Sequence, residues 1–163
     1  MNAHDAIKAS MTVPDMIMNS YLGDLTDEEL LVRPTEGANH IAWQLGHLLT
    51  SEHGMIEQVC PGSMPALPDG FAEKYTKETS TSDDSAAFLS KAEYLQLFSE
   101  QRAGTLKALD GLSADDLDKP SPKGLQRIGA TIGAIFLMQP THWTMHTGQW
   151  AIIRRKIGRP PMF

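Results

Sequence analysis

Three histidines in this chain have the spacing needed to bind a metal ion. His142 and His146 are four residues apart in one apolar segment, and His47 lies in another. On an α-helix, residues four apart project from one face, about 6 Å apart along the axis, so both imidazoles can reach one ion. His47, on a neighbouring helix, would supply a third nitrogen. Three imidazoles without a fourth protein ligand leave one position open, which is typical of reactive rather than structural zinc sites.

Each histidine also has a simpler interpretation. A single histidine on an apolar helix face is more often a hydrogen-bonded core residue, and many His-x-x-x-His pairs lie on the surface. Here one helical stripe surrounds the pair with apolar residues, so we expect both rings to point inward. The stripe is Ile135, Met138, His142, His146, Gln149 and Ile153. Two buried imidazoles without partners would cost on the order of several kcal/mol, and a metal ion would satisfy both.

Polar residues near these histidines in sequence are candidates to support the site. Gln149 follows His146 by three residues and could hydrogen-bond a ligand ring or a metal-bound water. Such a contact would fix the tautomer and orientation of the ring. Gln44 and Ser51 flank His47 at minus three and plus four, so both could line the same pocket. The other histidines rank lower: we expect His40 near a helix start and His4 and His53 in solvent.

Other reactive residue types have weaker claims. Cys60 is the single cysteine, so it forms no internal disulfide, and no histidine near it in sequence activates it as a nucleophile. Glu52 and Glu57 are candidate general bases but align poorly with His47. Three tryptophans (Trp43, Trp143 and Trp150) are interpreted as core packing. A basic cluster closes the last helix, either solvated and favoured by the helix dipole or an anchor for an anionic substrate or thiol cofactor: Arg154, Arg155, Lys156 and Arg159.

Four long segments are predicted to be helices from their apolar periodicity, over 3–21, 39–59, 85–109 and 131–157. Asn39 is a favourable N-cap for the second, and Gly158 ends the fourth. Pro14 and Pro140 are expected to kink the first and fourth helices. At Pro140, a kink could direct the two histidine rings toward a common point. Alternatively, it is an irregularity that is tolerated near a helix end facing solvent. Residues 26–30 and 112–117 are predicted to form short capped turns.

These elements predict an all-α protein, since no stretch shows the sustained alternation of a strand. The connection from Cys60 to Ser85 is long enough to run back along a helix about 30 Å long. Parallel neighbours in a bundle need such a crossover, whereas antiparallel neighbours need only short loops. We therefore predict a four-helix bundle, up-down-down-up, with a long crossover between helices two and three. The whole chain, residues 1–163, is expected to form a single domain.

Length and composition narrow the classes of protein. A chain of 163 residues can bury its own core, and 41% hydrophobic residues argue against disorder. The formal charge of −6 argues against nucleic-acid or anionic-membrane binding, since both favour a basic surface. No segment has about 18 uninterrupted apolar residues, and the N-terminus lacks the pattern of a secretion signal. We expect a cytoplasmic protein whose partner is a small molecule.

Two motifs resemble those of the DinB/YfiT-like superfamily of metalloenzymes. The first is Ile41-Ala42-Trp43-Gln44-Leu45-Gly46-His47-Leu48-Leu49. The second is His142-x-x-x-His146-Thr147-Gly148-Gln149, followed by a basic segment that ends in Gly158-Arg159-Pro160-Pro161. The resemblance spans nearly the whole chain in order and spacing, and the second motif is its most specific part.

The resemblance implies a four-helix bundle with one divalent metal, often zinc or nickel, held by His47, His142 and His146. It also implies a homodimer in many members. Characterised relatives include bacillithiol-dependent transferases and a mycothiol-dependent maleylpyruvate isomerase. We therefore expect a metal-dependent enzyme, favouring a thiol-dependent S-transferase or isomerase that uses a low-molecular-weight thiol. The alternatives are a metal-dependent hydrolase and a non-catalytic, stress-associated metal-binding protein. Pro140 departs from the family pattern, and residues 61–70 carry no substrate signature.

Overall fold

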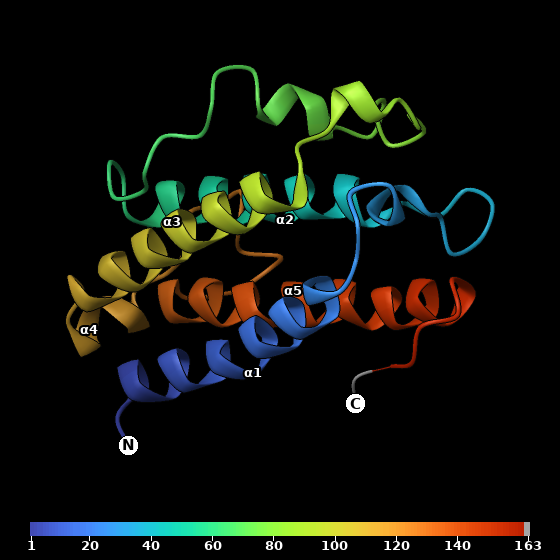
Figure 1. The fold of residues 1–163 in the computed structure, drawn as a ribbon. Helices are drawn as coiled ribbons and strands as arrows, with labels where there is room; N and C mark the ends of the chain where they lie inside the picture. Colours follow the sequence, from blue (N-terminus) through green and yellow to red (C-terminus); the bar gives the residue numbers. More distant parts are fainter. Residues whose placement is uncertain (162–163) are drawn as a thin grey trace.

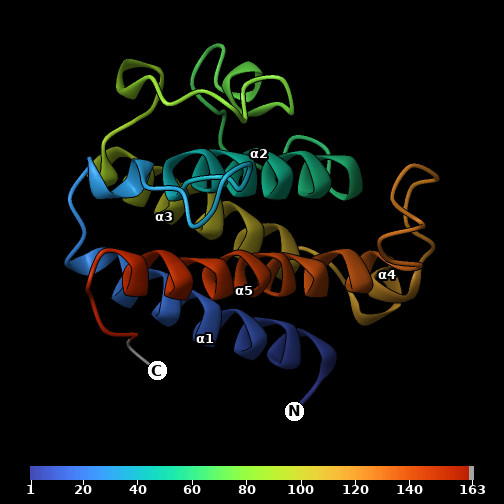
Figure 2. The ribbon, with the colours of Figure 1, turned by 90° about the vertical axis from the view of Figure 1, so that its right-hand side faces the viewer.

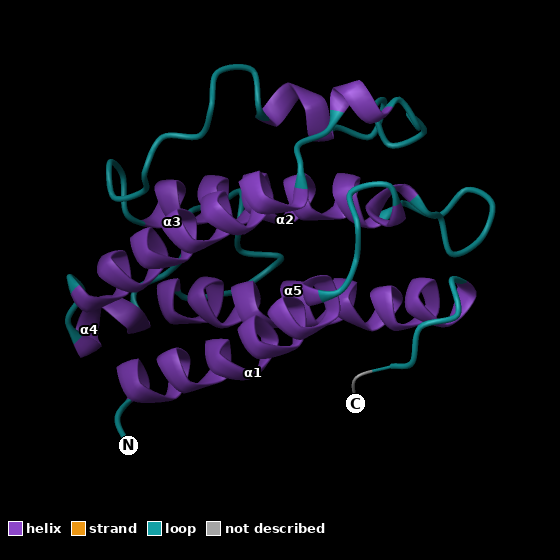
Figure 3. Cartoon of the chain, in the orientation of Figure 1, coloured by secondary structure: helices purple, strands orange, loops and turns teal. Residues whose placement is uncertain are grey.

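The computed structural model describes residues 1–161, and helices dominate it (Figure 3). No β-strand occurs in this part of the chain, where one isolated bridge joins Pro120 and Thr131. The predicted all-α class is therefore confirmed. The α-helices are α1 (Ala3–Gly23), α2 (Ile41–Val59), α3 (Lys91–Asp110), α4 (Ala114–Asp118) and α5 (Ile132–Lys156), with 3-10 turns η1 (Glu29–Leu31), η2 (Ala72–Tyr75) and η3 (Ser85–Ala87). No helix among the described residues is long and apolar enough to cross a bilayer.

The four long helices pack side by side (Figures 1 and 2). α1 lies along α5, and α2 packs against both α3 and α5. The connection between α2 and α3, which carries η2, lies over the outer side of α2. Because α2 and α5 are neighbours in the bundle, the two segments that carry the candidate ligands face each other.

Two helix starts differ from the sequence-based predictions. α3 begins at Lys91, not near Ser85, because Ser90 and Glu93 form a reciprocal capping box, in which each side chain accepts from the other residue's backbone N–H. Residues 85–87 form only a 3-10 turn. The N-cap of α2 is His40 rather than Asn39, and its Nδ1 accepts a hydrogen bond from the backbone N–H of Trp43.

The buried face of α5 is also shifted from the predicted stripe. Its centre follows Gln139, Trp143, Thr147, Trp150 and Ile153, each at most 2% exposed. His142 and His146 lie beside this face and are half-buried, and Gln149 is exposed. The prediction that the pair points into the core overestimated the burial of the two rings, which lie at the margin of the core. The assignment of Trp143 and Trp150 to core packing agrees with their burial.

Both long helices with internal prolines continue through them. α1 includes Pro14, and α5 includes Pro140. In α5 the Thr144 hydroxyl donates to the backbone oxygen of Pro140 at 2.8 Å. The helical turn that carries His142 and His146 is therefore intact despite the hydrogen bond that proline removes.

In the basic cluster at the end of α5, Arg155 and Lys156 are exposed, as the solvated interpretation predicts, whereas Arg154 and Arg159 differ from both interpretations. Arg154 is fully buried and donates to the Asp24 carboxylate and to the backbone oxygens of Tyr21 and Pro160. Arg159 pairs with Asp24 and Glu29. These two guanidinium groups fasten the end of α5 to the segment after α1, so they are neither a solvated cluster nor an anchor for an anion.

Candidate metal centre

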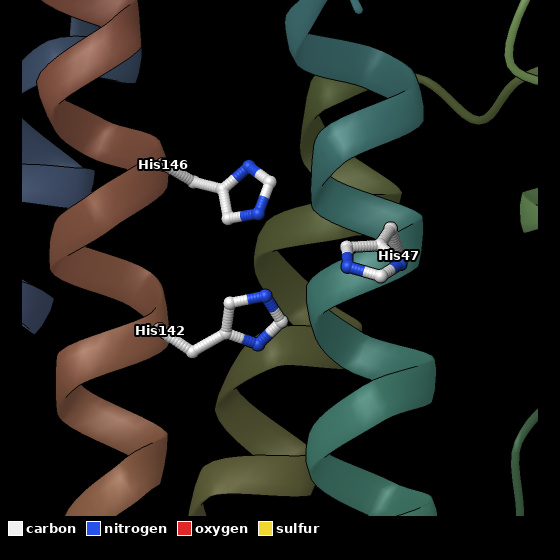
Figure 4. A group of neighbouring side chains, drawn as sticks. All are labelled: His47, His142 and His146. Atoms are coloured by element: carbon white, nitrogen blue, oxygen red, sulfur yellow. The ribbon is translucent and has the colours of Figure 1, made fainter. Parts of the chain in front are cut away.

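His47, His142 and His146 form one cluster between α2 and α5 (Figure 4). One nitrogen of each ring can be chosen so that the three lie within 4.8 Å of one another. The ring centroids are 4.9 Å apart for His142 and His146, and 5.2 and 5.5 Å from His47 to those two. The structure thus brings together all three histidines that the sequence singled out.

The cluster fits a single metal ion with small adjustments. A tetrahedral ion with metal–nitrogen bonds of about 2.1 Å holds its ligand nitrogens about 3.4 Å apart. The three ligand nitrogens, which lie within 4.8 Å of one another, therefore need to approach by at most about 1.4 Å, which rotation of the side chains can provide. The group contains no Cys, Asp or Glu from the described residues. Three neutral donors with no fourth side chain match the ligand count of an open site.

The electrostatic environment keeps these imidazoles neutral. Burial lowers the pKa of His47 below its usual value. Burial, together with the neighbouring histidines, lowers the pKa of His142 and of His146 to about 4. Neutral imidazole is the form that binds a metal ion, because a protonated ring has no free lone pair. At neutral pH the cluster is ready to bind.

A buried glutamine on α2 connects the two helices beside the cluster. The Oε1 atom of Gln44 lies 2.9 Å from Nδ1 of His146 and accepts from Nε1 of Trp150, also at 2.9 Å. Its Nε2 donates to the backbone oxygen of Asn39 at 2.6 Å and to Oε1 of Gln149 at 3.3 Å. The residue that contacts a candidate ligand ring is therefore Gln44, whereas Gln149 contacts Gln44.

The third candidate ligand is packed by an aromatic neighbour. The Trp43 indole stacks on the His47 ring with centroids 5.1 Å apart and planes 6° from parallel. Its Nε1 donates to the hydroxyl of Thr79 at 3.3 Å, in the connection that covers α2. Trp43 is buried, in agreement with its assignment to core packing, and its contact with the His47 ring was not predicted. The four-residue spacing from His47 was the available signal for this contact.

Other candidate residues lie outside the cluster. Ser51 is half-buried one turn along α2 from His47. His40 is fully buried at the start of α2, and its Nε2 lies 3.1 Å from the backbone oxygen of Ser82. The expectation that His4 and His53 lie in solvent was wrong. Both are half-buried, with ring nitrogens near the Leu112 carbonyl and the Gln101 side chain.

The two candidate general bases are already engaged in structural contacts. Glu52 is 2% exposed and accepts hydrogen bonds from Arg102, Thr105 and Trp143. Glu57 accepts from the backbone N–H groups of Gly62 and Met64 and closes the turn after α2. These contacts occupy the carboxylate oxygens that proton transfer would need.

Fold and cluster together define a helical bundle with a histidine group suited to one metal ion. The profile of the DinB superfamily matches residues 16–150 of this chain. The match covers most of the sequence, and the chain belongs to this superfamily. A comparison with curated proteins found no match.

Proposed function

We propose that this protein is a divalent-metal-dependent enzyme that acts on a small molecule. The observation that carries the proposal is the cluster of three neutral imidazoles, with ligand nitrogens within 4.8 Å and no fourth ligand-type side chain among the described residues. A structural zinc site usually fills four protein positions, whereas a catalytic site keeps one for water or substrate. His47, His142 and His146 would hold the ion, and zinc or nickel suits imidazole ligands.

Thiol transfer or thiol-assisted isomerisation is the preferred reaction class, with hydrolysis as the alternative. A divalent ion in this site would lower the pKa of a bound thiol or water enough to supply a nucleophile near neutral pH. Glu52 and Glu57 are engaged elsewhere, so we assign no side chain of this chain as general base. The choice between thiol and water rests on the family resemblance.

Metal content is the first test of this proposal. Untagged protein, purified without a nickel column, should carry about one divalent ion per chain by mass spectrometry. His146→Ala should lose it, because the pair on α5 can no longer chelate. His53→Ala is the matched control. Like His146, His53 is a half-buried histidine on a long helix, but it lies on α2 and outside the cluster. Wild-type protein that takes up no added zinc or nickel would overturn the proposal.

A second measurement separates the enzyme from a non-catalytic metal-binding protein. Metal-loaded protein should accelerate the conjugation of a model electrophile with a low-molecular-weight thiol, and chelator-treated protein should not. Equal rates for the two forms would exclude the metal-bound thiol as the nucleophile. Metal binding without any thiol or hydrolytic turnover would favour the non-catalytic alternative.

The helix order is a further part of the proposal. We propose the up-down-down-up arrangement, in which α2 and α5 run in opposite directions. The sequence colours in Figures 1 and 2 support it, since α1 and α5 progress one way and α2 and α3 the other.

We also propose a homodimer, as the family resemblance implies. Several apolar side chains on α1 and α5 are about half exposed, which supports a contact with a second chain. They are Val13, Met16, Leu137, Met145 and Ile152. Light scattering after size exclusion should give twice the chain mass of 17.9 kDa. A monomeric mass at micromolar concentration would remove the dimer from the proposal.

A further inference from the structure

The side-chain amide of Gln44 has its orientation fixed at both ends. The indole N–H of Trp150 can only donate, so the amide atom that it contacts at 2.9 Å must be the oxygen. The backbone oxygen of Asn39 can only accept, so the amide atom 2.6 Å from it must be the nitrogen. Two independent partners therefore give the same assignment of the amide atoms, and neither partner is the ring of His146.

This orientation determines where the proton of His146 lies. Nδ1 of His146 is 2.9 Å from Oε1 of Gln44, and an amide oxygen cannot donate. Nδ1 must therefore carry the hydrogen. Only the neutral form of the ring has a lone pair that can bind a metal ion. With the single proton on Nδ1, the lone pair is on Nε2.

Burial makes this contact hard to replace. Gln44 has no exposed surface, and Trp150 is equally buried on the opposite helix. If the His146 ring turned its unprotonated Nδ1 to Gln44, two acceptors would meet without water to separate them. The Nδ1–H tautomer is thus imposed by the packing of α2 on α5, although histidine in water prefers the proton on Nε2.

We propose that Gln44 is the positioning residue of the site: it holds His146 in the Nδ1–H tautomer and presents Nε2 to His47 and His142. The significance for metal binding rests on the proposed function, whereas the tautomer does not. Partners of this kind fix the ring of a ligand histidine, and their loss costs about 10- to 100-fold in metal affinity. Gln44 therefore acts through His146 and does not touch the ion.

The tautomer can be read directly in the metal-free protein. Long-range ¹H–¹⁵N correlation spectra at pH 7.5 should show Nδ1 of His146 as the protonated nitrogen. Gln44→Leu should shift His146 toward the Nε2–H tautomer. Gln44→Glu should retain Nδ1–H, because a carboxyl group protonated on the oxygen that faces the Asn39 carbonyl still accepts from the ring through its other oxygen. Wild-type protein with the hydrogen on Nε2, or an unchanged tautomer in folded Gln44→Leu, would overturn the proposal.

Zinc affinity supplies the second readout. Competition with a chromophoric chelator should show about 10- to 100-fold weaker binding by Gln44→Leu than by wild type. Gln149→Ala is the matched control, since it removes only the exposed partner at 3.3 Å and Asn39 still holds the amide. Unchanged affinity in a folded Gln44→Leu protein would contradict the positioning role.

The two readouts separate this inference from the proposed function. Wild-type protein that shows the Nδ1–H tautomer but binds no zinc would end the metal proposal and leave the orientation of His146 by Gln44 established. Should Gln44→Leu fail to fold, Gln44→Met replaces it, because this side chain has a length similar to glutamine but lacks the amide oxygen that accepts from Nδ1 of His146. An unchanged proportion of Nδ1–H in that variant would then overturn the role assigned to the amide.

Discussion

Nε1 of Trp143 donates to Oε2 of Glu52 at 2.7 Å in the core of the bundle. Both residues lie beside candidate ligands, since Trp143 follows His142 and Glu52 lies five positions after His47. The bond therefore ties α2 to α5 immediately behind the histidine cluster. The other carboxylate oxygen of Glu52 accepts from Arg102 and Thr105 of α3, so three helices meet at this one buried carboxylate.

Removal of the Trp143 donor should destabilise the protein more than removal of a comparable indole elsewhere. Trp143→Phe leaves Oε2 of the buried Glu52 side chain without this partner, which should cost about 1–3 kcal/mol beyond the loss of ring volume. Trp43→Phe is the control, because it deletes the same atoms, breaks one hydrogen bond of 3.3 Å to Thr79 and keeps an aromatic ring beside His47. Urea unfolding measures both. Equal losses in the two variants would show that the Glu52 bond adds nothing specific.

The same network contains a carboxylate whose ionisation is unfavourable. Asp15 of α1 lies 3.2 Å from Nη2 of Arg102, yet burial raises the pKa of Asp15 from 3.8 to about 6, with a further contribution from Glu52. Because the folded pKa of Asp15 is raised, the protonated Asp15 side chain contributes stability that is fully present below about pH 3.8. This contribution is lost as pH rises through about 6.

Asp15→Asn should reveal this dependence. The stability of wild type relative to the variant should fall by about 1 kcal/mol between pH 5 and pH 7.5, because the asparagine does not ionise. Comparing the two proteins at each pH cancels the titration of the histidines. Urea unfolding at both pH values gives the difference. A wild-type advantage that increases with pH would mean that the Arg102 ion pair outweighs the burial of Asp15.

The ligand set was predictable because it depends on local spacing. His142 and His146 share a helix face wherever that helix packs, and His47 lies in a second apolar helix. Their depth was not predictable, because the buried face of α5 depends on which helices cover it. Six candidate positions formed one stripe in the sequence, but α1 and α2 bury the side that carries Trp143 and Trp150.

Two misassignments have different physical origins. The start of α3 was present in the sequence as Ser90-Lys91-Ala92-Glu93, a capping-box pattern, but apolar residues Phe88 and Leu89 extended the apparent periodicity upstream. By contrast, no local pattern indicates that Gln44 rather than Gln149 contacts His146. That contact depends on the rotation of α2 against α5 and on a backbone oxygen of Asn39.

A glycine next to His47 controls how the long connection covers α2. A Cβ at Gly46 would lie 2.1–2.2 Å from ring atoms of Tyr75, which is buried and bonded to the Tyr94 hydroxyl at 2.6 Å. Gly46→Ala should therefore destabilise the protein by about 1–3 kcal/mol, since the ring cannot move without breaking that bond. Gly54→Ala is the control: nothing lies within 4 Å of its Cβ, so it should stabilise α2 by about 0.5–1 kcal/mol. If both variants unfold at a temperature equal to or higher than that of wild type, the tight contact between Gly46 and Tyr75 would be contradicted.

The low pKa values of the cluster make a prediction about zinc binding in acid. Three histidines with ordinary pKa values near 6.5 would compete with protons strongly enough to weaken zinc binding about 1,000-fold between pH 7.5 and 5.5. In the folded protein, His142 and His146 have pKa values of about 4 and so remain neutral over this range. Only His47, whose pKa is lowered as well, can contribute, which limits the loss to about tenfold.

Competition titrations with a chelator, corrected for the chelator's own protonation, measure this loss at each pH. The free energy of unfolding of the metal-free protein should change in the same window. Because the folded pKa values of His142 and His146 are depressed, the contribution of these two histidines to stability is fully present above about pH 6.5. That contribution is lost as pH falls toward 4. His146→Ala should lose part of that dependence, and His53→Ala should keep it. A zinc affinity that falls about 1,000-fold by pH 5.5 would show that the histidines titrate as if in water, contrary to their burial between α2 and α5.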